Sequence, residues 1–193
     1  QERLKILSQY VRPCFLIGFM ASGKTTLGRA LGARPGYRFI DLDEEVENEV
    51  GMKVADIFAM RGEKYFRSIE SRVLRRVAGE AEKEMDSTFV IACGGGTPCH
   101  DGNMEFMNSK GTCVLLQASD DVILRRLREA PAGQRPLVDN SCSDDELLAF
   151  IAERRQSRRY YYEKASCRFD SSRLESESEI NCSVERFIKE LNI

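Results

Sequence analysis

Features that mark several common protein classes are missing from this sequence. It contains a single histidine, His100, and no Gly-x-Ser-x-Gly motif, so it offers little support for a hydrolase with a catalytic triad. Its 29 lysines and arginines do not outnumber its 31 aspartates and glutamates, and the net charge of -2 provides no positive field for a nucleic acid backbone. No internal repeat and no low-complexity segment is visible. We therefore expect one globular domain over residues 1–193 that does not bind nucleic acid.

The seven cysteines do not suggest a metal site. None of them forms a Cys-x-x-Cys pair or a zinc-ribbon spacing, and their odd number fits a reducing compartment. Hydrophobic runs are short as well, because the longest apolar stretch, near residues 14–21, is far too short to span a bilayer. Residues 1–13 lack the apolar core of a signal peptide, although an N-terminal targeting segment could have been removed. We expect a cytoplasmic monomer without a membrane partner.

Short apolar segments alternate with segments of helical periodicity along the chain. The apolar segments predict strands at residues 14–18, 38–41, 88–93, 111–117 and 167–170. The helical periodicity predicts helices at residues 24–31, 44–50, 62–81, 102–108, 120–129, 144–165 and 184–191. Strands that alternate with helices pair in parallel through right-handed crossovers, which cover both faces of the sheet with helices. The sequence therefore predicts a three-layer α/β/α fold.

Two segments have the composition of loops. Residues 130–145 contain two prolines and a glycine among polar residues, and we expect them to form a mobile lid. The polar segment at residues 171–178 is expected to be an exposed loop. Asp120, which follows the fourth predicted strand, is predicted to cap the next helix.

Residues 18–25, Gly-Phe-Met-Ala-Ser-Gly-Lys-Thr, match the phosphate-binding pattern Gly-x-x-x-x-Gly-Lys-[Ser/Thr]. The motif lies between a predicted buried strand and a predicted helix, which is the position that phosphate binding requires. Its glycines let backbone amides face the phosphates, Lys24 neutralises the β and γ oxygens, and the Thr25 hydroxyl ligates magnesium. The sequence thus predicts ATP and Mg²⁺ as cofactors. The residues of this loop that we expect to contact the nucleotide are Ala21, Ser22, Gly23, Lys24, Thr25 and Thr26.

A second polar motif, Asp41-Leu42-Asp43, ends the second predicted strand, where ligands of open α/β sheets gather. If the strand geometry persists, the alternation places both aspartates on the same side. One carboxylate could then serve magnesium while the other reaches an acceptor hydroxyl. The alternative is a strand end that leads into a helix, with Glu44 and Glu45 favouring the helix start.

The sequence carries a set of motifs, and its members are Gly18 to Thr25, Asp41-Leu-Asp43, Phe66-Arg67, Gly94-Gly-Gly96, Arg135-Pro-Leu137, and Arg158 four residues before Tyr162. In order and spacing, this set resembles the motifs of the shikimate kinase family. The resemblance covers about residues 12–170. It implies a fold like that of nucleoside monophosphate kinases, with a five-stranded parallel sheet, a mobile lid at about 130–145 and a helical substrate-binding part at about 44–82. It also implies that the protein phosphorylates the 3-hydroxyl of shikimate with MgATP, a step of aromatic amino acid biosynthesis.

The resemblance assigns roles in phosphoryl transfer. Asp43 would orient the attacking hydroxyl and accept its proton, and Asp41 would share the magnesium ion with the threonine of the phosphate-binding loop, partly through water. Lys24 and the lid arginine, Arg135, would stabilise charge on the phosphoryl oxygens. Arg128, seven residues before Arg135, would flank the adenine ring.

The same resemblance assigns the residues that bind the acceptor. Shikimate carries one carboxylate and three hydroxyls, and the guanidinium groups of Arg67 and Arg158 would grip the carboxylate. Gly94, Gly95 and Gly96 lack a Cβ, so their backbone amides could reach the hydroxyls of the ring.

Some of these residues have simpler explanations. Arg67 could form a helix ion pair with Glu63 or Glu70, which lie at helical spacing. The three glycines could form only a flexible turn from strand to helix. Arg158 is distinguished from the neighbouring arginines only by its spacing to Tyr162.

Two other functions remain open at this point. One is a kinase of the same fold that acts on another small acceptor, such as gluconate or a nucleoside monophosphate. The other is a non-catalytic relative that binds ligands without turnover. The presence of Lys24, Thr25, Asp41, Asp43 and Arg135 together argues against the second.

Overall fold

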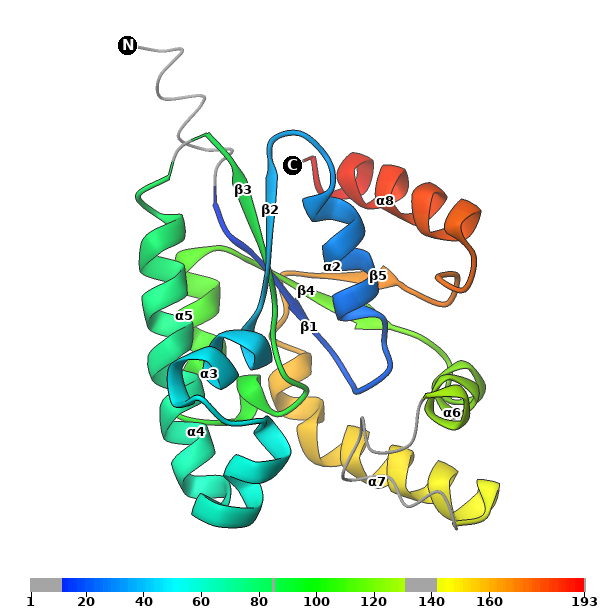
Figure 1. Ribbon diagram of the computed structural model, residues 1–193. Helices are drawn as coiled ribbons and strands as arrows, with labels where there is room; N and C mark the ends of the chain where they lie inside the picture. Colours follow the sequence, from blue (N-terminus) through cyan, green and yellow to red (C-terminus); the bar gives the residue numbers. More distant parts are fainter. Residues whose placement is uncertain (1–11, 85, 131–141, 193) are drawn as a thin grey trace.

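A five-stranded sheet forms the centre of the computed structural model, which describes residues 12–84, 86–130 and 142–192. Every pairing in the sheet is parallel, and the strand order is β2-β3-β1-β4-β5 (Figure 1). The strands are β1 Cys14–Ile17, β2 Tyr37–Asp41, β3 Thr88–Ala92, β4 Thr112–Gln117 and β5 Cys167–Asp170. The sequence-based prediction of a parallel sheet, and its implied strand number, are confirmed.

Helices cover both faces of this sheet. They are α2 Lys24–Gly32, α3 Leu42–Val50, α4 Val54–Ala81, α5 Asn103–Lys110, α6 Asp120–Glu129, α7 Asp144–Tyr162 and α8 Glu177–Leu191, with a short 3₁₀ helix, η1, at Thr97–Cys99. Helices α2 and α8 pack on one face, while α4 and α5 pack on the other (Figure 1). The predicted three-layer arrangement is confirmed.

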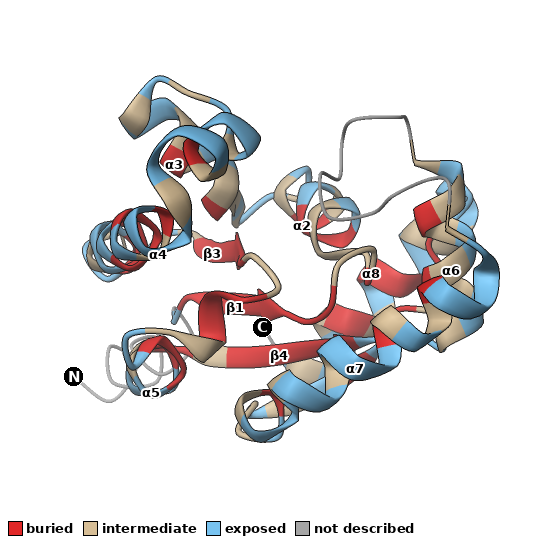
Figure 2. Cartoon of the chain, turned by 90° about the horizontal axis from the view of Figure 1, so that it is seen from below, coloured by how far each residue is buried: buried red, intermediate tan, exposed pale blue. Residues whose placement is uncertain are grey.

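The central strand β1 shows why the sheet must be covered twice. Cys14 and Leu16 belong to the core cluster that α2 and α8 complete, whereas Phe15 and Ile17 belong to the cluster formed with α4 and α5. All four side chains are buried, as Figure 2 shows for the strands in the middle of the molecule. Burial of one such side chain contributes about 1.5–3 kcal/mol, so both faces favour folding. No helix among the described residues combines the length and the apolar character that crossing a membrane requires.

Helix α6 has the predicted bounds but not the predicted N-cap. Its N-cap is Ser119, whose side chain accepts a hydrogen bond from the backbone N–H of Val122 at 3.4 Å. The prediction that Asp120 is the cap is therefore wrong. Both residue types can cap a helix, and Ser119 has the extended backbone that a cap needs. Asp120 is the first helical residue and pairs with Arg155.

Helix α8 starts at Glu177, well before the predicted start at residue 184. Ser176 and Glu179 form a capping box, in which each side chain accepts a hydrogen bond from the other residue's backbone N–H. The predicted exposed loop at residues 171–178 is therefore shorter and ends at Ser176, and two of its residues, Ser171 and Leu174, are buried. Leu174 packs into the core cluster of α2 and α8.

Helix α4 is longer than predicted and is bent. It begins at Val54, and Gly62 interrupts the helical backbone with φ 80° and ψ 168°. This φ lies in the left-handed region that glycine adopts at low cost. The apolar periodicity predicted only the part that follows this bend.

The predicted lid falls mostly outside the described residues, since residues 131–141 are not among them. Its last two residues, Asp144 and Asp145, belong to α7 and not to a loop. A capping box between Ser143 and Glu146 begins this helix. At the other end, α7 stops at Tyr162 instead of residue 165.

Candidate active site

The phosphate-binding motif forms a tight loop between β1 and α2, at the end of the sheet that points down in Figure 1. Gly18 and Gly23 have φ values of 142° and 90°, which favour glycine. A Cβ at Gly18 would lie 2.6 Å from the carbonyl oxygen of Leu116, and one at Gly23 would lie 2.3 Å from Leu174 Cδ1. Ala21 adopts a φ of 60° without being a glycine, a strained conformation of the kind found at functional sites. The loop is therefore tightly packed from both sides.

Lys24 folds back onto this loop. Its Nζ donates hydrogen bonds to the carbonyl oxygens of Gly18 and Phe19 at 2.9 and 2.8 Å. Burial lowers the pKa of Lys24 to about 8, although the carboxylates of Asp43 and Asp41 act in the opposite direction. The ammonium group thus keeps its charge at neutral pH and sits where phosphate oxygens would arrive.

Asp41 connects the loop to the second strand. Its Oδ2 accepts a hydrogen bond from Thr25 Oγ1 at 2.9 Å, and its Oδ1 accepts one from the backbone N–H of Asp43 at 3.1 Å. Asp41 is therefore the N-cap of α3, and the strand geometry does not persist to Asp43, which lies in the first turn of that helix. The backbone thus follows the alternative interpretation, in which the strand end leads into a helix. The contact between Asp41 and Thr25 also fits the prediction that these two residues share a magnesium ion.

The chemistry of this donor pair suits Mg²⁺. Within the described residues, no group of three or more His, Cys, Asp or Glu side chains converges as a metal site. Magnesium in nucleotide enzymes needs only one or two protein oxygens, because phosphate oxygens and water complete its octahedron. The hydroxyl of Thr25 and the carboxylate of Asp41 could supply those oxygens.

Asp43 is a largely buried carboxylate that titrates near neutrality. Burial, together with the neighbouring carboxylates of Glu70 and Asp41, raises its pKa to about 7, although Lys24 and Arg67 oppose the shift. A carboxylate with a pKa near the working pH is suited to accept a proton from a hydroxyl.

Residues 94–96 form a turn after β3, the glycine turn, which three side chains approach closely. A Cβ on Gly94 would lie 3.3 Å from Asp43 Oδ1, and a Cβ on Gly95 would lie 2.8 Å from Arg158 Nη1. A Cβ on Gly96 would lie 2.6 Å from Arg67 Nη2. None of the three glycines has a positive φ, so close approach and not backbone conformation explains them. The glycine turn thus brings together three side chains from β2–α3, α4 and α7.

Arg67 forms ion pairs with both Glu63 and Glu70, as the simpler explanation predicted, but its side chain does not lie on an exposed helix face. Its Nη2 lies 3.2 Å from Glu63 Oε1 and its Nη1 lies 2.9 Å from Glu70 Oε2. The Glu70 side chain is fully buried, and its other oxygen accepts a hydrogen bond from Thr97 Oγ1 at 2.5 Å. Glu70 therefore fixes the guanidinium group of Arg67 beside the glycine turn.

Sequence reasoning treated Glu70 only as an alternative partner of Arg67. One signal was present, because Glu70 lies four residues after Phe66 and four before Leu74, within the apolar stripe of α4. A buried carboxylate in such a stripe needs partners, and here Arg67 and Thr97 provide them.

Arg158 differs from the arginines around it. Arg155 pairs with Asp120, and Arg159 pairs with Glu163. Arg158 instead lies between the glycine turn and the ring of Phe19, whose centroid is 5.8 Å from its Cζ. The geometry thus distinguishes the arginine that the spacing to Tyr162 had selected.

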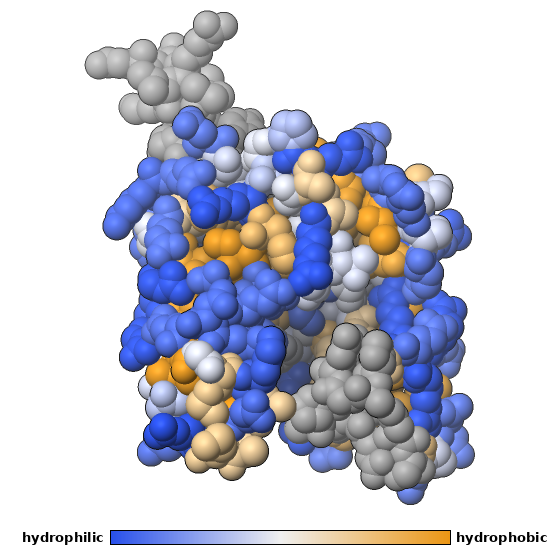
Figure 3. Space-filling view, in the orientation of Figure 1, coloured by the Kyte–Doolittle hydropathy of each residue, from blue (hydrophilic) through white to orange (hydrophobic). Residues whose placement is uncertain are grey.

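A pocket of about 430 Å³ lies beside the phosphate-binding loop. Its lining residues are Ala21, Gly23, Lys24, Thr25, Thr26, Arg126, Glu129, Ala130, Leu174 and Glu175. Figure 3 shows the surface hollowed at this end of the sheet, with mostly hydrophilic residues around the hollow. The phosphate-binding loop forms one wall, and α6 and the segment after β5 form the other.

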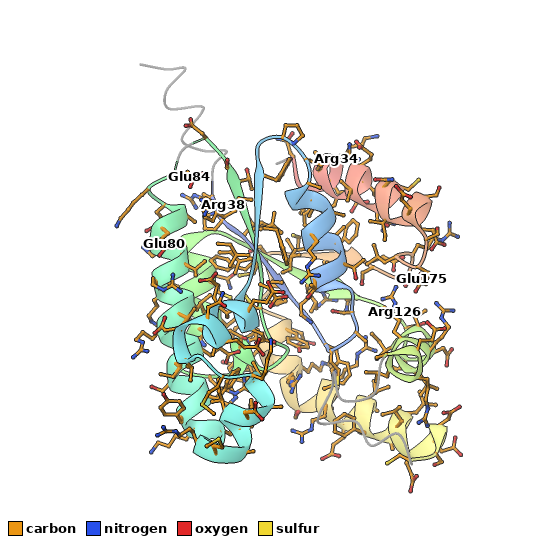
Figure 4. The ribbon with its side chains drawn as sticks, viewed as in Figure 1. Arg34, Arg38, Glu80, Glu84, Arg126 and Glu175 are labelled. Carbon is orange, nitrogen blue, oxygen red and sulfur yellow. The ribbon has the colours of Figure 1, made fainter. Side chains whose placement is uncertain are left out.

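Arg126 ties these walls together, and sequence reasoning missed it. Its guanidinium group donates to the carbonyl oxygens of Ala21 at 3.2 Å and Ser171 at 2.9 Å, and to Glu175 Oε1 at 2.9 Å. Figure 4 shows Arg126 and Glu175 next to each other. No sequence signal separates Arg126 from its neighbours, since its partners lie far away along the chain.

Arg128, the residue expected beside the adenine ring, does not line this pocket. It pairs with Asp144 at 2.9 Å and donates to the carbonyl oxygen of Cys142 at 2.6 Å. Arg135 lies outside the described residues.

A larger hollow of about 560 Å³ lies between β4 and α7 and includes only Phe19 of the phosphate-binding loop. Two of its three arginines, Arg155 and Arg159, are already paired with carboxylates. The residues with phosphate-binding chemistry line the smaller pocket, and we therefore place the candidate active site there and at the glycine turn.

The raised pKa of Asp43 predicts how stability depends on pH. The folded protein holds a proton up to about pH 7 that the unfolded chain releases near its ordinary pKa of 3.8. The stability contributed by this proton is complete below pH 3.8 and is lost as the pH rises through 7. Asp43→Asn, which stays neutral, should therefore be more stable than the parent at pH 8, by at most about 4 kcal/mol.

Urea unfolding at several pH values between 5 and 8 tests this expectation, and the gain should shrink as the pH falls. Glu153→Gln, at an exposed position of α7, is the matched control and should not change the pH dependence. If Asp43→Asn is no more stable than the parent at pH 8, the ionised carboxylate of Asp43 does not destabilise the folded protein.

Comparisons with known proteins agree with this geometry. The family model described as "Shikimate kinase" matches residues 20–191. A shikimate kinase of Phocaeicola vulgatus is 43% identical over 178 residues, which are 92% of this chain and 97% of that protein. The crystal structure of shikimate kinase from Bacteroides thetaiotaomicron matches with a TM-score of 0.85 at 39% identity, covering 94% of this chain and 99% of that one.

A further solved structure, shikimate kinase from Acinetobacter baumannii in complex with shikimate, has a TM-score of 0.77 at 25% identity and covers 97% of both chains. The matches extend over nearly the whole chain, from the phosphate-binding loop to the last helix. They confirm the resemblance that the motifs carried. This chain belongs to the shikimate kinase family.

Proposed function

We propose that this protein transfers the γ-phosphoryl group of ATP to the 3-hydroxyl of shikimate, which yields shikimate 3-phosphate and ADP. The observation that carries this proposal is the convergence of Asp43, Arg67 and Arg158 on the glycine turn, beside the phosphate-binding loop. A compact acceptor with one carboxylate and several hydroxyls would place its anion against the two arginines. One of its hydroxyls could then reach the Asp43 carboxylate.

In the proposed mechanism, the protein acts by positioning and by neutralising charge. Lys24 would exchange the carbonyl oxygens of Gly18 and Phe19 for β and γ phosphate oxygens. Asp43 would orient the attacking hydroxyl and accept its proton, for which a pKa of about 7 is suitable. Arg135 would add positive charge from the segment that precedes α7.

Mg²⁺, held by Thr25 and partly through water by Asp41, would neutralise charge on the phosphate oxygens when bound. The hydrogen bond between Thr25 and Asp41 supports this assignment, because it brings the two oxygens within 2.9 Å of each other. On the other side of the site, the helical part at residues 44–82 contributes Arg67 and its partner Glu70.

An assay of ADP formation tests the proposed reaction. The purified protein with MgATP should release ADP in the presence of shikimate, and far less with gluconate, with a nucleoside monophosphate or with no acceptor. ADP release that depends on one of the other acceptors would support the rival kinase function. Tight ATP binding without any acceptor-dependent release would support the non-catalytic alternative.

Arg67→Lys should raise the KM for shikimate about ten-fold. Lysine offers a single point charge, whereas the planar guanidinium group of arginine can donate two hydrogen bonds to the carboxylate of shikimate. The KM for ATP should change little, since Arg67 lies on the acceptor side of the site. Steady-state kinetics with each substrate varied measures both effects.

Arg72→Lys is the matched control, because Arg72 lies on the same helix and pairs with Glu49 at an exposed position. It should leave both constants unchanged. If calorimetry shows that Arg67→Lys binds shikimate as tightly as the parent, Arg67 serves only its ion pairs with Glu63 and Glu70.

We also propose that the enzyme works as a monomer in the cytoplasm. All seven cysteines are free thiols, which fits a reducing compartment.

A further inference from the structure

We propose that Tyr162 is a positioning residue for the acceptor, because its hydroxyl holds the glycine turn against which Arg158 lies. The inference rests on the proposed function, in which Arg158 binds the acceptor carboxylate. Tyr162 is the last residue of α7, and its Oη donates a hydrogen bond to the carbonyl oxygen of Gly95 at 2.7 Å. The positive charge of Arg158, one helical turn earlier on α7, acts on the same phenol. Arg158 also lies against Gly95, so the two side chains meet at the glycine turn.

Arg158 depends on few other contacts for its position. Within the described part of the chain it forms no ion pair, in contrast to Arg155 and Arg159. Its guanidinium group lies against the backbone of Gly95 on one side and faces the ring of Phe19 on the other. An aromatic ring restrains a guanidinium group weakly. The hydrogen bond from Tyr162 to Gly95 thus fixes the backbone against which Arg158 lies.

The hydrogen bond of Tyr162 is kept over a wide pH range. A phenol has one proton to donate, and here the proton goes to the Gly95 carbonyl. Burial raises the pKa of Tyr162 to about 12, although Arg158 acts in the opposite direction. The phenol therefore keeps its proton, and the bond persists, over the whole working pH range.

A simpler explanation is that Tyr162 is an ordinary core residue whose hydroxyl happens to meet a carbonyl. Its ring does pack in the core cluster of α4 and α5, and the side chain is buried. The two explanations predict different results when only the hydroxyl is removed. A core role affects the stability of the fold, whereas a positioning role affects the binding of the acceptor and spares that of ATP.

Tyr162→Phe keeps the ring in the core and removes the hydrogen bond to Gly95. We expect kcat/KM for shikimate to fall about ten-fold, mainly through KM, because the glycine turn beside Arg158 loses the hydrogen bond that positions it. The KM for ATP should stay within about two-fold, since the nucleotide pocket does not include Tyr162. Tyr161→Phe removes the neighbouring hydroxyl, whose ring stacks edge-on against Tyr160, and should change neither constant.

A double-mutant cycle with Arg158→Ala shows whether Tyr162 acts through Arg158. If it does, adding Tyr162→Phe to Arg158→Ala should cost little beyond the single arginine change. Full additivity of the two effects would overturn the proposal, as would a Tyr162→Phe protein with an unchanged KM for shikimate and only a lower melting temperature. A parent enzyme that does not use shikimate would instead refute the proposed function. Calorimetric titration of each folded variant with shikimate provides the same comparison without turnover.

Discussion

Lys24→Ala is expected to lower kcat by about 10²–10³-fold, the cost of removing one group that stabilises charge in a transition state. Its ammonium group is held at the mouth of the phosphate-binding loop by the carbonyl oxygens of Gly18 and Phe19. With a pKa of about 8 it is charged at pH 7, and it is already desolvated before the nucleotide arrives. Its removal should therefore weaken ATP binding and also slow transfer.

The measurement is ADP release at saturating shikimate with the ATP concentration varied, together with circular dichroism to verify the fold. Lys189→Ala, at an exposed position in the last turn of α8, is the control and should behave like the parent. A folded Lys24→Ala enzyme with nearly normal kcat would remove Lys24 from phosphoryl transfer.

Asp43→Asn is expected to lower kcat by about 10²–10⁴-fold, the usual contribution of a general base, while ATP affinity is kept. The amide has the shape of the carboxylate, so the approach to the glycine turn is preserved. For the parent, the pKa of about 7 implies that kcat/KM rises with pH up to neutrality, because the ionised form is the one that accepts a proton. This rise should disappear in the residual activity of the variant.

Asp56→Asn, in an exposed position at the start of α4, controls for the loss of one negative charge. Its pH profile should match that of the parent. If Asp43→Asn retained the rise of kcat/KM towards pH 7, another group would be the base and Asp43 would only orient the acceptor.

The elements that the sequence predicted well are those whose signals are local. The phosphate-binding loop follows from eight consecutive residues, and the parallel sheet follows from alternating apolar segments. The start of α8 was missed because the apolar periodicity begins only near Val184, whereas the capping box at Ser176 and Glu179 sets the true helix start. The residues between the cap and the apolar stripe are polar, so they looked like a loop.

The contacts that complete the site could not be predicted, because they join distant parts of the chain. Arg126 reaches a carbonyl 105 residues away, Tyr162 reaches one 67 residues away, and Thr97 reaches Glu70 across 27 residues. A single sequence identifies the residue types but not which of several arginines or glutamates meets a given backbone group. Arg126 and Arg128 illustrate this limit, since Arg126 lines the pocket beside the phosphate-binding loop while Arg128, two residues later, pairs with Asp144.

The position of β1 in the middle of the sheet has a consequence for the order of folding. Cys14 on this strand pairs in register with Val90 on one side and Thr112 on the other. During synthesis, β1 and the phosphate-binding loop therefore emerge long before either neighbouring strand exists. Sheets built from such long-range pairings fold slowly, because large loops must close before any contact stabilises them. Nucleotide binding should accordingly appear late in folding, together with closure of the sheet.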